Sequence, residues 1–399
     1  MRRVIMNDNK LDLTEIPMLD NHCFMFAEKT KSLSISDFEQ YYLPGGPTAM
    51  GLSYNEGSTT SSFLMKSSVA FPNFVKELGK YFDCDPDIDS IIKIRNTKSE
   101  DYREYLRNLF GDVNLNWLLT DTGNITVEDL QNSFLNWIPI KGRAILRLET
   151  AIKQLLEEAK TFAEFINSYD QVIKDAIRKK GCVSFKSVIA YRTGLDIENV
   201  GEEDAKQDFN RYLNKEEKIE WYGPVVKKLR DYLFTYTLRR CAELNVALNV
   251  HTGIGDTDIV ASKCNPINLT NILKDEENRK AKVVIIHGGF PYTMEACWLA
   301  NVLPNVYIEL SPPMPPYFAP AVSAKRYREI IEFTPGPKII YGSDAGSFPE
   351  THWLIAKTAK KSTARALSDL IVDEAINENE AYHIARMIFS ENATRLHNL

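Results

Sequence analysis

The sequence lacks the features that mark membrane, secreted and nucleic-acid-binding proteins. It contains no run of about 18 apolar residues, and the N-terminal stretch MRRVIMNDNKLDLTEIP turns polar before an apolar signal core can develop. The formal net charge is −6, and no basic stripe with interleaved aromatic residues occurs. We therefore expect a cytoplasmic protein that binds neither membranes nor nucleic acid.

Cysteine is sparse and unpaired in pattern. The 6 cysteines are dispersed without a C-x-x-C pair, which argues against a zinc knuckle or a redox motif and favours free thiols, several of them buried. Low-complexity tracts and internal repeats are also absent. With 44% hydrophobic and 26% charged residues, the chain can bury a core and keep a solvated surface. Residues 1–399 are therefore expected to form one elaborated domain.

Short apolar runs alternate with segments of helical periodicity along the chain. This alternation indicates parallel strands joined by crossover helices. The predicted strands are Met18 to Phe24, Asn114 to Leu119, Arg143 to Leu148, Cys182 to Ala190, Val246 to His251, Val283 to His287, Val306 to Leu310 and Lys338 to Tyr341. Eight such strands fit a closed (β/α)8 TIM barrel, a fold of the α/β class.

The connection between the first two predicted strands is too long for a plain crossover. Roughly ninety residues separate them, and they include the loop LPGGPTAMGLSYNEGSTTSS and a helix-like stretch from Phe71 to Phe110. We predict a helical cap at about residues 35–110 that covers the mouth of the barrel. The segment Ala151 to Lys180 is expected to be helical with an apolar packing stripe, and Leu367 to Leu396 is expected to form extra C-terminal helices.

Polar side chains stand at the ends of several predicted strands. His22 lies near the end of the first strand, His251 and His287 end the fifth and sixth, and Asp344 follows the last. In a barrel of this type, side chains at the C-terminal strand ends converge on one mouth. Imidazole and carboxylate groups together suit a divalent ion, such as zinc. The three remaining histidines, His352, His383 and His397, lie in segments of helical periodicity and are expected to be ordinary helix residues. His352 alone lies close enough to the predicted mouth to be kept as an alternative ligand.

Two further features concern strand geometry. Regular alternation would put Asp20, His22 and Phe24 on one face of the first strand, with Asn21 and Cys23 on the other. Lys186 interrupts the apolar strand in CVSFKSVIAYRTGL. A buried lysine must be paired, deprotonated or chemically modified, whereas the alternative is a lysine whose charged end reaches solvent.

This set of residues suits hydrolysis. A zinc-like ion lowers the pKa of its bound water towards about 7 and polarises the attacked carbonyl. A neighbouring carboxylate can then accept and relay the proton, and Asp344 is the natural base.

Taken together, these residues resemble the amidohydrolase superfamily, in its amidohydrolase-related branch of TIM-barrel metal-dependent hydrolases. The resemblance extends to domains fused to glutamine-synthetase-like proteins. The matching strings run in order from the first strand to the last: LDNHCF, FKSVIAYRTGL, VALNVHTGIGDTDI, NPINL, VVIIHGGFPYTMEACWLA, PNVYIELS, IIYGSDAGSFPE and ENATRL.

The resemblance implies a set of functional residues. His22, Lys186, His251, His287 and Asp344 would bind a divalent metal, zinc or alternatively manganese, with Lys186 carbamylated in some members. Asp344 and His287 would be the catalytic residues. Arg192 and Glu350 resemble substrate-facing positions, and the alternative for both is a surface salt bridge.

The sequence departs from the family pattern on the first strand. The pattern there is His-x-His, but this chain has His22-Cys23-Phe24. Phe24 cannot bind a metal, which puts a two-metal site in doubt. Three functions follow: a hydrolase acting on a C–N bond of a small carboxylate-bearing metabolite, a non-oxidative decarboxylase, or a catalytically weakened binding or regulatory protein. The partner would be a small molecule, and a homo-oligomer is left open.

Overall fold

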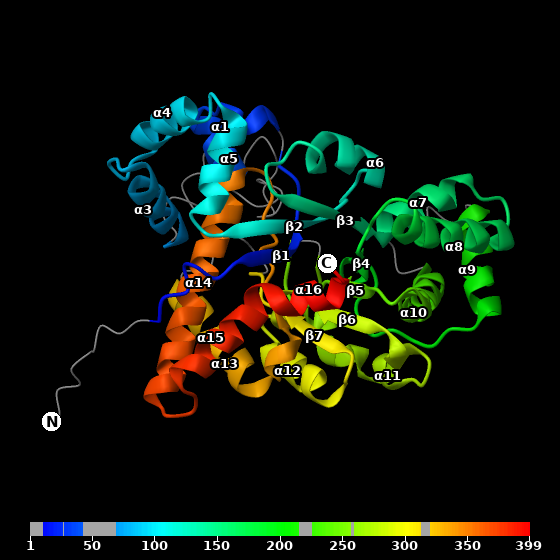
Figure 1. Cartoon of the computed structure of the whole chain (residues 1–399). Coiled ribbons are helices and arrows are strands. Elements are labelled where there is room, and N and C mark those ends of the chain that lie inside the picture. Colours follow the sequence, from blue (N-terminus) through cyan, green and yellow to red (C-terminus); the bar gives the residue numbers. More distant parts are fainter. Residues whose placement is uncertain (1–10, 27, 43–68, 215–225, 257–258, 313–319) are drawn as a thin grey trace.

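The computed structural model describes residues 11–26, 28–42, 69–214, 226–256, 259–312 and 320–399. Its centre is a single sheet of eight parallel strands paired in sequence order (Figure 1). The strands are β1 (Met18–Cys23), β2 (Leu115–Asp121), β3 (Lys141–Arg147), β4 (Ser184–Ser187), β5 (Ala247–Val250), β6 (Lys282–Ile285), β7 (Val306–Glu309) and β8 (Ile339–Ile340). All eight predicted strands are confirmed, with ends that shift by a few residues.

The sheet curls so that its last strand returns to its first. The backbone N–H of Asn21 donates to the carbonyl of Tyr341 at 3.1 Å, and that of Asp344 donates to the carbonyl of His22 at 2.8 Å. These bonds join β1 to the segment that follows β8 and make the barrel nearly closed. The predicted TIM-barrel fold is confirmed.

Helices surround the strands and bury an extensive hydrophobic layer against them. Between β2 and β8 the helices are α6 (Val127–Leu130), α7 (Leu148–Glu158), α8 (Phe162–Arg178), α9 (Glu202–Leu213), α10 (Lys227–Leu244), α11 (Thr270–Lys274), α12 (Thr293–Val302) and α13 (Pro320–Phe333). After β8 come α14 (Pro349–Val372), α15 (Glu378–Arg386) and α16 (Asn392–His397). None of the helices in the described ranges is long and apolar enough to cross a lipid bilayer.

A second, smaller core fills the inside of the barrel. Leu19, Leu119, Ile145, Val284 and Ile340 of the strands pack there with Ala393 and Leu396 of α16. The side chain of His397 in the same helix contacts the Asn21 amide oxygen at 2.6 Å. The C-terminal helix therefore closes the end of the barrel away from the strand carboxyl ends.

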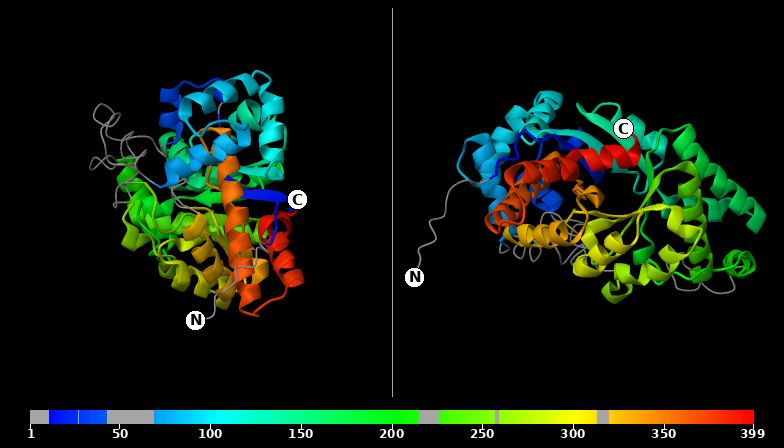
Figure 2. Two further views of the ribbon diagram at one scale, coloured as in Figure 1. Left: turned by 90° about the vertical axis from the view of Figure 1, so that its left-hand side faces the viewer. Right: turned by 60° about the horizontal axis from the view of Figure 1, so that its bottom comes forward.

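The insertion after β1 is helical, as predicted. Its described helices are α1 (Ile35–Tyr42), α3 (Ala70–Phe82), α4 (Ile88–Lys98) and α5 (Tyr102–Gly111). Figure 2 shows them gathered around one end of the long helix α14. Phe38 and Phe74 stack with centroids 5.4 Å apart, and both rings meet Phe348 at the start of α14. The predicted glycine-rich loop at residues 43–62 lies outside the described residues.

Candidate active site

His22, Lys186 and Asp344 meet at the carboxyl end of the barrel. His22 comes from β1, Lys186 from β4 and Asp344 from the loop after β8. The Lys186 Nζ lies 3.0 Å from the His22 Nε2, and the His22 Nδ1 lies 3.3 Å from the Asp344 Oδ1. His22 and Lys186 are buried. Lys186 therefore points into the barrel, and the alternative that its charged end reaches solvent is ruled out.

His251 and His287 form a second pair from the ends of β5 and β6. The His287 Nε2 lies 3.1 Å from the His251 Nδ1. On its other side, the His287 Nδ1 lies 2.8 Å from the Ser311 Oγ, which itself donates to the Glu309 carboxylate at 2.6 Å. Because the Ser311 proton goes to Glu309, Ser311 accepts from the His287 Nδ1–H. The Nε2 of His287 then turns a lone pair toward His251.

The two groups adjoin each other without forming one compact cluster. The rings of His22 and His287 lie 6.3 Å apart between centroids. Within the described ranges, however, only Asp20, Cys23 and His352 bring three His, Cys, Asp or Glu donor atoms within 4.8 Å of one another. The structure thus assembles the predicted ligands as a group of three and a pair, and shared ligation by His251, His287 and Asp344 stays a prediction.

Two ligand candidates have strained backbone conformations. His287 has φ of 65° and Asp344 has φ of 55°, in the left-handed region that non-glycine residues rarely adopt. Such conformations cost on the order of 1–2 kcal/mol each. Residues are held in them where the surroundings dictate the position of the side chain, which is typical of functional sites.

The electrostatics of the site favour neutral imidazoles. Burial lowers the pKa of His22 to about 3 and puts those of His251 and His287 well below the ordinary value. Burial also lowers the pKa of Lys186 to about 8, opposed by the nearby Asp344 and Asp121 carboxylates. The pKa of Asp344 is raised, again chiefly by burial.

Asp121 and Arg147 belong to this site, although neither was predicted. Asp121 ends β2, with its Oδ2 at 3.9 Å from the His22 Nε2, and it accepts from the Arg147 Nε at 3.1 Å. The Arg147 guanidinium, at the end of β3, lies 5.3 Å from the centre of the Phe24 ring. Both stand at strand ends, so the rule that drew attention to the histidines could also have found them.

The strand β1 does not alternate regularly. His22 and Phe24 do lie side by side, with ring centroids 5.5 Å apart. Asn21, however, bonds the Asn249 amide oxygen at 3.2 Å across the barrel, whereas Asp20 accepts from Ser343. The pairing register with β2 shifts between Asp20 and Cys23. The prediction that Asp20 shares the face of His22 is therefore wrong, because this irregularity turns the strand.

Comparisons with known proteins bear on the family and the fold. A sequence model of the amidohydrolase family matches residues 220–399. Protein fluG of Emericella nidulans is 31% identical over 242 residues, a match that covers 59% of this chain and 28% of that protein's length. A structure from Lactobacillus casei, assigned as a metal-dependent hydrolase, superposes with a TM-score of 0.79 at 24% identity over 96% of each chain. Residues 220–399 therefore resemble the amidohydrolase family, and the chain as a whole shares its fold with the Lactobacillus casei structure.

More distant structures share only the fold of this chain. Uronate isomerase from Thermotoga maritima has a TM-score of 0.69 at 13% identity, covering 96% of this chain and 95% of that one. Glucuronate isomerase from Caulobacter crescentus has a TM-score of 0.63 at 11% identity, covering 96% and 92%. One fold supports several reactions, so the reaction must be argued from the site.

The family implies a divalent metal, and the residues fit one. The Nδ1 of His251 and the Nε2 of His287, 3.1 Å apart, match the edge of a coordination sphere with bonds of about 2.0–2.1 Å once a metal replaces the proton between them. His22 Nδ1 is buried and has no hydrogen-bond partner within the described ranges. Neutral imidazoles are also the form that binds metals.

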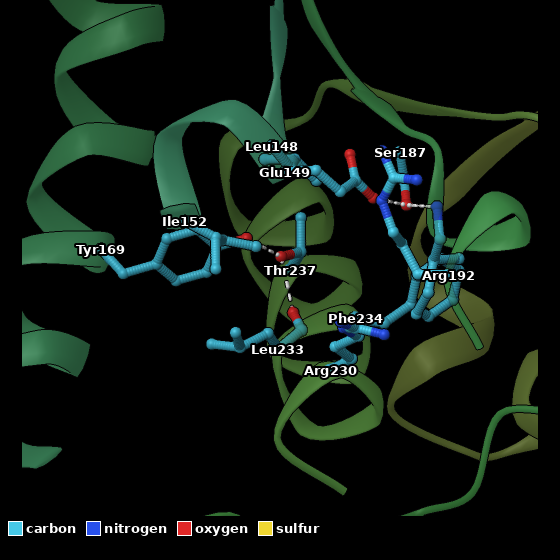
Figure 3. Close-up of a pocket in the computed structure, with 11 residues that line it drawn as sticks. Leu148, Glu149, Ile152, Tyr169, Ser187, Arg192, Arg230, Leu233, Phe234 and Thr237 are labelled. Carbon is cyan, nitrogen blue, oxygen red and sulfur yellow. Dashed lines mark hydrogen bonds between the residues drawn. The ribbon is translucent and has the colours of Figure 1, made fainter. Parts of the chain in front are cut away.

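Arg192 lies beside the site, in the wall of two adjoining cavities. One, of about 320 Å³, lies between β4 and helices α7, α8 and α10, where Figure 3 shows Arg192 near Glu149 and Ser187. The other, of about 880 Å³ and open to solvent, is lined by both Arg192 and Arg147. Since Arg147 touches the ligand group through Asp121, Arg192 faces a space that adjoins the site.

Glu350 is placed differently from what the sequence suggested. It is 1% exposed, and its Oε1 accepts from the Arg95 Nε and the Tyr105 hydroxyl, each at 2.6 Å. Arg95 and Tyr105 belong to the cap helices α4 and α5. Through these contacts, which include a buried ion pair with Arg95, Glu350 holds the cap helices against α14.

The remaining histidines and the cysteines have separate places. His383 is exposed on α15, and His397 helps to close the far end of the barrel. His352 is buried in α14 against the outer side of β1. All six cysteines are free, and all but Cys84 are buried, as the sequence predicted.

Proposed function

We propose that this chain is a metal-dependent hydrolase that cleaves a C–N, amide-like bond of a small carboxylate-bearing metabolite. The observation that carries the proposal is the meeting of His22, Lys186 and Asp344 beside the pair His251 and His287. Five polar groups from β1, β4, β5, β6 and β8 are held here at the carboxyl ends of the strands, two of them by strained backbone. A barrel builds its active site at this face.

The metal, zinc or alternatively manganese, would be held by His251 and His287 together with His22, Lys186 and Asp344. When bound, it supplies a Lewis acid that polarises the scissile carbonyl. His287 takes its orientation from Ser311 and Glu309, which fix its Nδ1 proton. Such partners of a ligating imidazole set its tautomer and ring position.

Asp344 is the residue that moves the proton. Burial raises its pKa above that of an ordinary carboxyl, which makes the carboxylate a stronger base toward the attacking water. It would accept the proton of the attacking water and then deliver it to the leaving nitrogen. The contact of Asp344 with the His22 Nδ1 at 3.3 Å keeps this carboxylate at the centre of the site.

A carboxylate on the substrate would be recognised by Arg192. Arg192 and Arg147 line the same solvent-open cavity, and Arg147 pairs with Asp121 beside His22. A guanidinium pairs with a carboxylate through two parallel hydrogen bonds, which fixes orientation as well as affinity. We do not assign Glu350 to substrate binding, because its Oε1 already accepts hydrogen bonds from Arg95 and Tyr105.

The test is a screen of protein loaded with Zn²⁺ or Mn²⁺ against carboxylate-bearing amides and against aromatic acids. Amine or ammonia release would support the hydrolase, whereas release of carbon dioxide alone would replace it by a decarboxylase. The Arg192→Met variant should raise KM for carboxylate-bearing amides and leave KM unchanged for the matching neutral amides. Protein that binds metal and turns over no compound in the screen would contradict hydrolysis.

Carbamylation of Lys186 is part of the proposal. The neutral amine of Lys186 would add carbon dioxide at Nζ and release one proton, giving an anionic oxygen donor in place of an amine. Protein incubated with ¹³C-bicarbonate should then show a carbamate carbon signal that is missing in Lys186→Met. A wild-type protein without this signal, at full metal content, would show that the free amine is the working form.

One observation favours a non-catalytic function as the second candidate. Phe24 replaces a family histidine, and the Arg147 guanidinium lies over its ring while pairing with Asp121. The positively charged guanidinium of Arg147 thus lies next to residue 24, where the family has a metal-binding histidine. Tight binding of a carboxylate without turnover in the screen would identify a binding or regulatory protein.

A further inference from the structure

A second group of metal-binding side chains lies on the other side of β1. Asp20 and Cys23 point away from His22 toward helix α14, where they meet His352. The donor atoms of these three residues all lie within 4.8 Å of one another, and each residue is fully buried. The group shares no side chain with the proposed catalytic site.

His352 is the member whose surroundings call for a ligand. No side chain of the described residues hydrogen-bonds to either ring nitrogen, and the one polar interaction of the ring is with the Phe24 backbone. Phe26 and Phe110 meet the imidazole edge-on, at centroid distances of 5.4 and 6.4 Å. A buried imidazole nitrogen without a partner is costly, and the Phe24 backbone can satisfy only one of the two nitrogens. The position of the ring toward Asp20 and Cys23 therefore points to a missing partner for the other.

Asp20 and Cys23 are already oriented by the strands around them. Asp20 accepts from the Ser343 backbone N–H and hydroxyl and from the His22 N–H, which leaves further lone pairs on its oxygens. The Cys23 sulfur lies 3.5 Å from the Leu119 carbonyl and 3.7 Å from the Thr120 hydroxyl. Both side chains therefore have defined positions before any ligand binds.

We propose that Asp20, Cys23 and His352 form a second, structural metal site that takes Zn²⁺ and ties β1 to α14. Thiolate, imidazole and carboxylate are the donors that zinc prefers. The charges of one thiolate and one carboxylate balance those of Zn²⁺, so the filled site is neutral inside an apolar region. On binding, the thiol and any carboxyl proton pass to solvent.

Ligand spacing and topology both suit this role. Zinc bonds of about 2.0–2.3 Å place neighbouring donors somewhat closer than 4.8 Å, within reach of small side-chain rotations. β1 is the first strand of the barrel, and α14 follows the last. The site would link the two ends of the barrel at the point where it closes. Through the His22 N–H it would also stabilise the strand that carries His22, a proposed ligand of the catalytic metal.

Cobalt gives a test that distinguishes this site from the catalytic one. The catalytic ligands are nitrogen and oxygen donors, so only Cys23 can give a sulfur-to-cobalt charge-transfer band in the near ultraviolet. Protein loaded with Co²⁺ should show this band and bind two ions per chain. Cys23→Ser should lose the band and one ion, whereas the control Cys241→Ser, which removes a buried thiol of α10, should keep both.

Further variants separate the two sites and guard against misfolding. His287→Asn should lose the catalytic ion and keep the band, while His352→Gln should weaken the band with its thiol intact. If Cys23→Ser does not fold, the His352→Gln result decides in its place. A wild-type protein that binds cobalt without the band, or a band unchanged in both Cys23→Ser and His352→Gln, would overturn the site and leave the proposed hydrolase unaffected.

Discussion

The Nζ of Lys186 and the Nε2 of His22 lie 3.0 Å apart in a buried environment. A protonated Lys186 therefore disfavours binding of a metal ion to the His22 Nε2. Burial lowers the pKa of Lys186 to about 8. Below that pH the ammonium occupies the contact and repels a metal ion, and above it the neutral amine is available as a ligand or for carbamylation.

Metal affinity at the catalytic site should therefore rise as the pH increases through about 8. Calorimetric titration of Cys23→Ser protein with Mn²⁺ at several pH values measures this site alone. In the additional variant Lys186→Met the step near that pH should disappear, because no ammonium remains to be displaced. A wild-type affinity that is flat over this range would show that Lys186 does not compete with the metal.

Asp344→Asn should abolish turnover without unfolding the protein. Loss of a general acid–base group typically lowers kcat by about 10²–10⁴-fold. Asparagine tolerates the left-handed backbone that Asp344 adopts, so the fold should remain. Asp83→Asn is the matched control, because Asp83 is also an aspartate with φ of 55° but is exposed at the end of α3. Retention of more than about a tenth of kcat would contradict the role.

Glu350→Gln should affect stability rather than substrate binding. Removing one partner of a buried ion pair leaves Arg95 uncompensated and costs about 3–5 kcal/mol. Urea unfolding should show this loss, with KM unchanged. The control Glu104→Gln breaks an exposed pair with Arg107 and should cost no more than about 1 kcal/mol. An increase in KM with normal stability would instead restore Glu350 to the substrate site.

These sites show which parts of the structure sequence patterns can predict. The strands were predictable because runs such as VVII and VALNV are apolar enough to be buried on both sides, as strands of a parallel sheet must be. His251, His287 and Lys186 could then be placed from the rule that function gathers at strand ends. That rule needs only the order of elements and their approximate ends.

Other features depend on contacts that no local pattern contains. The partner of Glu350 is Arg95, 255 residues away, so a buried anchor and a substrate-facing charge look alike in sequence. Asp20 left its expected face because the register shifts within β1. The strand-end rule could have placed Arg147 near the site, but its pairing with Asp121 on the neighbouring strand requires the barrel to be assembled first.

The departure from the family pattern at Phe24 can be tested by restoring the histidine. Arg147 lies 5.3 Å from the Phe24 ring and pairs with Asp121, so its positive charge would oppose a metal bound at residue 24. Phe24→His alone should therefore gain little metal. The double variant Phe24→His/Arg147→Met should gain close to one ion per chain, because it removes the opposing cation and frees the Asp121 carboxylate beside His22.

Metal content after gel filtration in metal-free buffer measures the gain, and all variants are made in the Cys23→Ser background to remove the second site. Arg147→Met alone is the control: it leaves Asp121 unpaired without adding an imidazole, so it should lose stability and gain less metal than the double variant. A gain of one metal ion per chain in Phe24→His alone would mean that Arg147 does not prevent metal binding at residue 24. In that case the missing imidazole by itself, and not the cation that lies over residue 24, limits this barrel to a single catalytic metal.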